Sequence, residues 1–261
     1  MIVVTGATGR FGPVVVDDLI AELPAGELAV VARDPEKARP FAERGVEVRQ
    51  ADYDDPASLG RAFAGADRLL FVSASDTSPG VRPRQHANVV AAAETAGVGH
   101  IVYTSAITAE DGASFLTDHT TTERAIRDAG LTYTFLRNTF YTEELVAPDL
   151  AKASELAAPA IGQPLVTAPI TDLALAASAV LTGTGHENAV YELRGPGWTY
   201  PQLAETLGVP YREVSDDESG MAFILPLLRL PQLGTPTPDL ERLLGRPATP
   251  IAEYVRGLQP A

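Results

Sequence analysis

The sequence contains no cysteine. This absence excludes disulfide bonds, thiol catalysis and cysteine-ligated zinc or iron–sulfur centres, so redox chemistry would need a bound cofactor. Long apolar runs are also missing, since none approaches the roughly 18 residues of a membrane span. The first apolar strand begins at residue 2, which leaves no space for a secretory signal. We therefore expect a cytoplasmic protein that does not enter a membrane.

Basic residues are few. The chain has 20 lysines and arginines against 34 acidic residues, which gives a net charge of −14. A surface of this sign repels nucleic acid and anionic membranes, and we expect neither as a partner. The four histidines have no ligand spacing with a carboxylate on one helix face. The sequence therefore predicts no metal site.

Only two lysines occur, Lys37 and Lys152. Conventional short-chain dehydrogenases use Tyr-x-x-x-Lys, in which the ammonium group lowers the pKa of the tyrosine so that it can donate a proton. The residues four positions before these lysines are Arg33 and Pro148, so the motif is absent. Alcohol or ketone chemistry through a tyrosine–lysine pair is thereby excluded.

The first half of the chain alternates short apolar runs with longer segments of helical spacing. Six such runs lie at residues 2–5, 27–32, 46–51, 68–74, 100–105 and 132–137. The pattern predicts βαβ units and an α/β fold of the Rossmann type, with a doubly wound parallel sheet over residues 1–140. Residues 141–261 are Pro/Ala-rich, with a helix near 171–183 and a strand near 189–195. We predict that they form a small C-terminal cap that is not stable alone.

Three glycines lie in "TGATGRFG", directly between the first predicted strand and the first predicted helix. Gly6 permits the tight turn, Gly9 lets the backbone approach a pyrophosphate, and Gly12 lets the helix pack against the strand. An ordinary glycine-rich turn is the alternative. The position inside a βαβ unit favours a dinucleotide site.

The choice between NADP and NAD depends on the end of the second strand, in "VVARDPEKA". Arg33 is suited to a 2′-phosphate, while Asp34 is placed to cap the following helix ahead of Pro35. We therefore expect NADPH as cofactor and NADH as a weaker one; a slip of one residue would bring Asp34 to the ribose instead. Asp52, after the third strand, either accepts from the adenine amino group or is a turn residue.

Polar and aromatic residues gather where the last predicted strands end, in "VYTSA", "DHTTTE" and "LRNTFYTE". Open α/β sheets bind ligands at the carboxyl ends of their strands. The candidates at this edge are Tyr103, Ser105, His119, Asn138, Phe140 and Tyr141. Each also has a simpler interpretation, such as local hydrogen bonding for His119 or a core position for Phe140.

With these motifs, the sequence resembles the atypical short-chain dehydrogenases of the NmrA-like branch, and most of all the NAD(P)H:quinone oxidoreductases of the type 2 group. The resembling segments run over nearly the whole chain and include "VTGATGRFG", "VARDPEKA", "IVYTSA", "HTTTERAIRDAGLTYTFLRNTFYTE" and "VYELRGPGWTYPQLAETLG". In this group an active edge without lysine is normal. Two stretches, 155–169 and 215–238, are shorter than the family leads us to expect.

The resemblance implies a set of cofactor contacts, to which we add Ser105. Gly6, Thr8, Gly9, Arg10, Phe11 and Gly12 would meet the pyrophosphate, Arg33 the 2′-phosphate, Ser73, Ala74 and Ser75 the middle of the cofactor, and Tyr103 and Asn138 the nicotinamide side.

The resemblance also implies hydride transfer from NADPH to a quinone or a related planar carbonyl acceptor. Phe140, Tyr141 and Tyr103 would flank the acceptor ring, Asn138 would hold it, and His119 or water would return the proton. The alternative is a non-catalytic NADP(H) sensor that acts through a partner.

Overall fold

The computed structural model describes residues 1–24, 26–107 and 116–258. Its central feature is a seven-stranded sheet with the order β3-β2-β1-β4-β5-β6-β8. The strands are β1 (Ile2–Val4), β2 (Leu28–Ala32), β3 (Glu47–Gln50), β4 (Arg68–Phe71), β5 (His100–Ala106), β6 (Tyr133–Asn138) and β8 (Ala189–Leu193). The first six pair in parallel. The strand order reverses beside β1, which is where such sheets bind dinucleotides.

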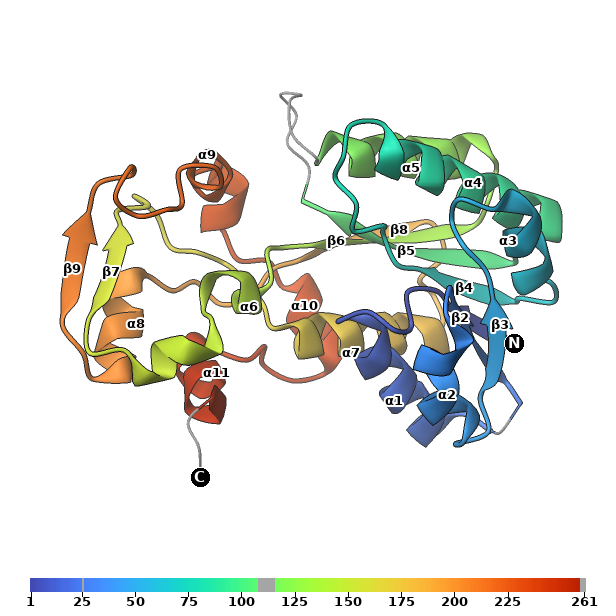
Figure 1. Ribbon diagram of the computed structural model, residues 1–261, viewed down its shortest axis with the longest axis horizontal. Helices are drawn as coiled ribbons and strands as arrows, with labels where there is room; N and C mark the ends of the chain where they lie inside the picture. Colours follow the sequence, from blue (N-terminus) through green and yellow to red (C-terminus); the bar gives the residue numbers. More distant parts are fainter. Residues whose placement is uncertain (25, 108–115, 259–261) are drawn as a thin grey trace. The chain divides into compact units, whose positions relative to one another are not determined.

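Helices cover both faces of this sheet (Figure 1). One face carries α3 (Pro56–Ala62), α4 (Val81–Ala96) and α5 (Thr117–Asp128), and the other carries α1 (Gly12–Glu22), α2 (Pro35–Ala42) and residues 174–182 of α7 (Ile170–Thr182). The inner strands β1 and β2 are buried along their whole length, so apolar side chains fill the space between the sheet and the helices on both faces. The predicted Rossmann-type α/β fold is confirmed.

The helices α2 and α3 begin at aspartates that cap them. Asp34 accepts from the backbone N–H of Glu36 at 3.1 Å and caps α2, as predicted. Asp55 caps α3 in the same way, and in both helices a proline occupies the first turn. These caps fix where the chain leaves each strand on the carboxyl side of the sheet.

The chain divides into two compact units, which we describe separately. The first consists of Met1–Asn138 and Ala174–Tyr191, and the second of Thr139–Leu173 and Glu192–Ala261. The sequence prediction placed residues 141–261 together as a cap without independent stability, and that lack of stability stays a prediction. No helix in the described ranges is both long and apolar enough to cross a membrane.

The second unit is built from short elements. A two-stranded parallel sheet pairs β7 (Leu156–Pro159) with β9 (Tyr211–Val214). Around it lie α6 (Thr142–Leu145), α8 (Tyr200–Leu207), α9 (Leu225–Leu228), α10 (Asp239–Leu244), α11 (Ile251–Leu258) and the 3-10 helices η1 (Pro148–Lys152) and η2 (Pro231–Gly234). Frequent prolines keep these elements short, because proline interrupts backbone hydrogen bonding.

Candidate functional site

The turn between β1 and α1 requires glycine at two positions. Gly6 has a φ of 63°, in the left-handed region. A Cβ on Gly12 would lie 2.3 Å from the Gly6 carbonyl oxygen, which no side chain can do. A Cβ on Gly9 would instead meet only that oxygen, at 3.3 Å, within 4 Å. The turn is therefore closed on its inner side at Gly12 and open beside Gly9.

The open side of the turn suits a pyrophosphate. Gly6, Thr8, Gly9 and Arg10 are exposed, while Phe11 is buried and precedes the first residue of α1. Backbone N–H groups at a helix N-terminus favour an anion there. The residues present fit a dinucleotide, and their individual contacts with it stay predictions.

The end of β2 has the arrangement that favours a 2′-phosphate. Asp34 is engaged as the cap of α2, and Arg33 is exposed directly after the strand. Its guanidinium can fork onto phosphate oxygens. Asp52 accepts from the backbone N–H of Asp54 at 3.0 Å, as in an Asx turn. An adenine contact for Asp52 stays a prediction.

The segment after β4 contains Ser73, Ala74 and Ser75, which are exposed or half-buried. Its backbone is held by buried side chains: the N–H of Ser73 donates to Thr104 Oγ1 and that of Ala74 to His86 Nε2, each at 2.9 Å. Sequence reasoning did not single out Thr104 or His86 for this role. The signal available was the run of polar residues, "RQHAN", at the start of an otherwise apolar helix.

Tyr103 and His119 form a buried pair in the first unit. The Tyr103 hydroxyl lies 2.8 Å from His119 Nδ1, and the tyrosine ring packs on Phe71 within the core. Burial raises the pKa of Tyr103, and burial together with the charge of Arg82 lowers the pKa of His119 to about 3. His119 is therefore neutral at physiological pH. Nicotinamide contact for Tyr103 stays a prediction.

Ser105 lies beside a buried ion pair. Its hydroxyl donates to Glu123 Oε1 at 2.7 Å, and Arg137 donates to both oxygens of the same carboxylate, at 2.9 and 2.7 Å. Glu123 is 1% exposed. This arrangement ties the ends of β5 and β6 to α5. The predicted cofactor contact of Ser105 is untested.

Asn138, the last residue of β6, has an unsatisfied buried amide. It is 5% exposed, and within the described part of the chain neither its Oδ1 nor its Nδ2 has a hydrogen-bond partner. Leaving a buried polar group unpaired costs about 1–3 kcal/mol, and a ligand's polar atoms would remove that cost. Phe140 and Tyr141 belong to the second unit, where both are half-buried.

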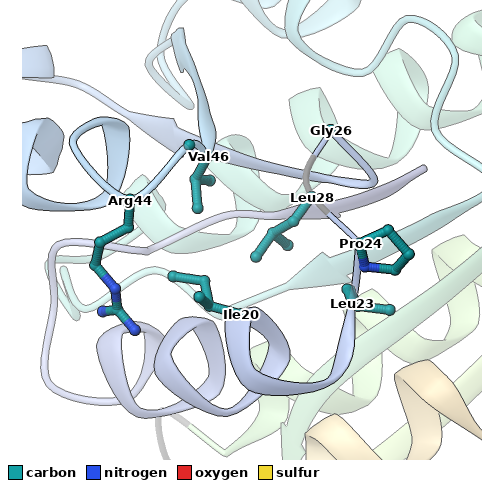
Figure 2. A pocket seen from close by; sticks show the side chains of 8 residues that line it. Ile20, Leu23, Pro24, Gly26, Leu28, Arg44 and Val46 are labelled. Carbon is teal, nitrogen blue, oxygen red and sulfur yellow. The ribbon is translucent and has the colours of Figure 1, made fainter.

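Two hollows in the described part of the chain are lined by none of these residues. Figure 2 shows one of about 90 Å³, lined by Ile20, Leu23, Pro24, Gly26, Leu28, Arg44, Gly45 and Val46. It lies at the amino ends of β2 and β3, the opposite end from ligand sites in open sheets. The other, of about 350 Å³, lies in the second unit, and its lining includes three prolines together with Tyr200 and Tyr211. Its volume falls within the range of small-molecule sites.

The sheet order, the glycine turn and the polar groups at the strand ends define a dinucleotide-binding protein. Residues 6–177 match the NAD(P)H-binding family, and the chain belongs to this family.

Relatives align over most or nearly all of its length. It is 36% identical to Quinone oxidoreductase 2 of Escherichia coli, covering 99% of this chain and 98% of that one. It is 34% identical to an NmrA-like family domain-containing oxidoreductase of Aspergillus flavus, covering 82% and 75%. Its fold matches the crystal structure of a Citrobacter sp. triphenylmethane reductase complexed with NADP(H), with a TM-score of 0.89, 36% identity and 99% coverage of both chains. The predicted family and an NAD(P)H-dependent oxidoreductase are confirmed.

Proposed function

We propose that the protein transfers hydride from NADPH to a quinone or a related planar carbonyl acceptor. The observation that carries this proposal is the unpaired, buried amide of Asn138 at the carboxyl end of β6, in a unit that also contains the glycine turn. Relatives of similar length that are named as a quinone oxidoreductase and a triphenylmethane reductase support a planar acceptor.

NADPH supplies the hydride when it is bound. The glycine turn and the N-terminus of α1 would hold its pyrophosphate, and Arg33 would pair with its 2′-phosphate. Asn138 can donate from Nδ2 and accept at Oδ1, so it can fix the orientation of a carboxamide or a carbonyl. Reduction of a quinone gives an aromatic, delocalised anion, and the reaction therefore needs positioning more than a strong acid.

The proton comes from water in this proposal. Burial and the charge of Arg82 lower the pKa of His119 to about 3, so the imidazole has no acidic proton to give at neutral pH. Its Nδ1 is already hydrogen-bonded to the Tyr103 hydroxyl. A hydroquinone anion needs no protein acid to leave, because water protonates it after the hydride has arrived.

A sensor without catalysis is the competing hypothesis. It would be favoured by an apolar docking surface in residues 219–233, and Phe223 there is 81% exposed. A single exposed ring is common on monomeric proteins and does not form a patch. The cytoplasmic location and the absence of nucleic acid partners stay predictions.

The test is NADPH oxidation by the purified protein, followed by absorbance, with a panel of quinones, diketones and aryl ketones. The Gly9→Val variant is the control, because it should lose the cofactor without unfolding. The proposal is supported if the unaltered protein oxidises NADPH with quinones and the Gly9→Val variant does not. Tight NADPH binding without oxidation by any acceptor would leave the sensor.

A further inference from the structure

The backbone that follows β4 is held by side chains from several other elements. The N–H of Val72 donates to Thr5 Oγ1 at 3.0 Å, and the carbonyl of Val72 accepts from the Tyr53 hydroxyl at 2.8 Å. Thr5 follows β1, and Tyr53 lies between β3 and α3. Both polar groups of Val72 are therefore fixed by parts of the chain far away in sequence.

The next two residues are held in the same manner. Thr104 Oγ1, on β5, accepts from the N–H of Ser73 at 2.9 Å. His86 Nε2 accepts from the N–H of Ala74 at 2.9 Å, and Arg82 Nε donates to its carbonyl at 2.8 Å. Arg82 and His86 are one turn apart on α4, 6% and 1% exposed. We call Thr5, Tyr53, Arg82, His86 and Thr104 the loop clamp.

The hydrogen bonds of His86 fix its tautomer. Since Nε2 accepts from Ala74, the proton of the neutral ring is on Nδ1, which donates to Thr122 Oγ1 at 2.7 Å. The Thr122 hydroxyl in turn donates to the carbonyl of Asp118 at 2.7 Å. Burial, with the neighbouring His119 and Arg82, lowers the pKa of His86 to about 3. The acceptor nitrogen is therefore present throughout the physiological pH range.

We propose that the loop clamp consists of positioning residues that hold residues 72–75 ready to receive the middle of the dinucleotide. The inference rests on the proposed function and on the family resemblance, which implies that Ser73, Ala74 and Ser75 meet that part of the cofactor. Buried polar side chains are costly unless paired, and here four of them, with the half-buried Tyr53, hold the backbone groups of three consecutive residues. The clamp engages only backbone groups, so the hydroxyls of Ser73 and Ser75 remain for a ligand.

A preformed loop increases affinity because binding then does not have to order it. The clamp should therefore act on the affinity for the whole dinucleotide. It should not act on a fragment that contains only the adenosine and its phosphates, which the proposal places at Arg33 and the glycine turn. This difference separates positioning from a general loss of structure.

The experiment compares Thr104→Val with Thr104→Ser. Valine has the same shape as threonine but removes the acceptor for Ser73, whereas serine retains it. Calorimetry with NADPH and with adenosine 2′,5′-bisphosphate measures both affinities. We expect Thr104→Val to weaken NADPH roughly 10-fold and the bisphosphate less than about twofold, with Thr104→Ser close to the unaltered protein. Hydrogen exchange without ligand should show faster exchange at residues 72–75 in Thr104→Val only.

Tyr53→Phe is the second variant, because it removes only the hydroxyl that binds the Val72 carbonyl, and it should act in the same direction. The proposal is overturned if NADPH affinity is unchanged in both variants, or if both ligands weaken equally. Catalysis is a separate outcome: a protein that binds NADPH through the clamp but oxidises none of it would refute the proposed function and leave this inference standing.

Discussion

The two units use buried and half-buried polar side chains for different purposes. In the first unit, five side chains hold the loop at residues 72–74, beside the carboxyl end of β4. In the second unit, such side chains join distant segments: Gln163 donates to the carbonyls of Leu228 and Leu230, and Asp172 accepts from Arg246 and from the N–H of Thr249. The first unit thus shapes a binding loop, while the second holds short elements together.

This difference predicts where mutations act. A change on the open side of a loop in the first unit should alter cofactor binding while leaving the sheet intact, because the buried inner strands do not depend on the side chains of that loop. Many contacts of the second unit join segments that are far apart in sequence. Changes there should therefore alter the binding of the acceptor and the stability of the fold together. The variants described next, from the largest expected effect to the smallest, test the half of that contrast that concerns the first unit.

Gly9→Val should abolish dinucleotide binding, with a loss of at least about 100-fold, because a branched side chain would fill the open side of the turn. The fold should survive, since a Cβ there meets only the Gly6 carbonyl oxygen, at 3.3 Å. Titration with NADPH and thermal unfolding measure the two effects. Gly12→Val is the contrasting variant and should fail to fold, because its Cβ would lie 2.3 Å from the same oxygen.

Arg33→Ala should remove the preference for NADPH over NADH. The charge-assisted contact with the 2′-phosphate is worth about 1.5–3 kcal/mol, or roughly 10- to 150-fold in affinity. Arg44→Ala is a suitable control, since this arginine pairs with Asp17 and lines the hollow at the amino ends of β2 and β3, opposite the proposed cofactor site. Equal affinities for the two cofactors in the unaltered protein would contradict the role of Arg33.

Asn138→Ala should lower turnover by roughly 10- to 100-fold while leaving NADPH affinity within a few-fold. The amide is unpaired in the first unit, so its loss removes no hydrogen bond of the folded protein and should not destabilise it. Steady-state kinetics and binding titration separate the two effects. A variant with full turnover would remove Asn138 from the proposed mechanism.

The sequence was informative where one short segment decides the structure. The glycine turn, the Asp34 cap and the parallel strands each depend on residues within one βαβ unit. The orientation of the Tyr103 side chain does not depend on one such unit: the residue lies in the middle of β5, and the packing of its ring against Phe71 and Phe135 shows that it belongs to the core. The loop clamp joins residues up to 67 positions apart, and no periodicity in the chain indicates such contacts.

Acidification should destabilise the protein below pH 6.5. Burial lowers the pKa of both His86 and His119 to about 3 in the folded state, whereas the unfolded chain binds protons near 6.5. The unfolded state therefore gains protons first as the pH falls, and the free energy of unfolding decreases from pH 6.5 toward 3. At pH 5 the loss is about 2 kcal/mol per histidine. Denaturant unfolding at pH 7 and pH 5 measures this loss, and His119→Gln should reduce the difference in unfolding free energy between the two pH values. An unfolding free energy that does not change between pH 7 and pH 5 would mean that these rings are hydrated.

The smallest effect on turnover should come from replacing His119, the candidate proton donor of the sequence analysis. His119 is neutral, with a pKa lowered to about 3 by burial and by Arg82, so it has no proton to lose between pH 5.5 and 8. If water protonates the product, His119→Ala should lower turnover less than about 10-fold, and the pH profile of the unaltered protein should show no step near 6.5. His119→Gln, which can still accept from the Tyr103 hydroxyl, should separate loss of that bond from loss of an acid. A step near 6.5 that disappears in both variants, with a fall in turnover beyond about 100-fold, would make His119 the acid and would require its ring to be charged in the working enzyme.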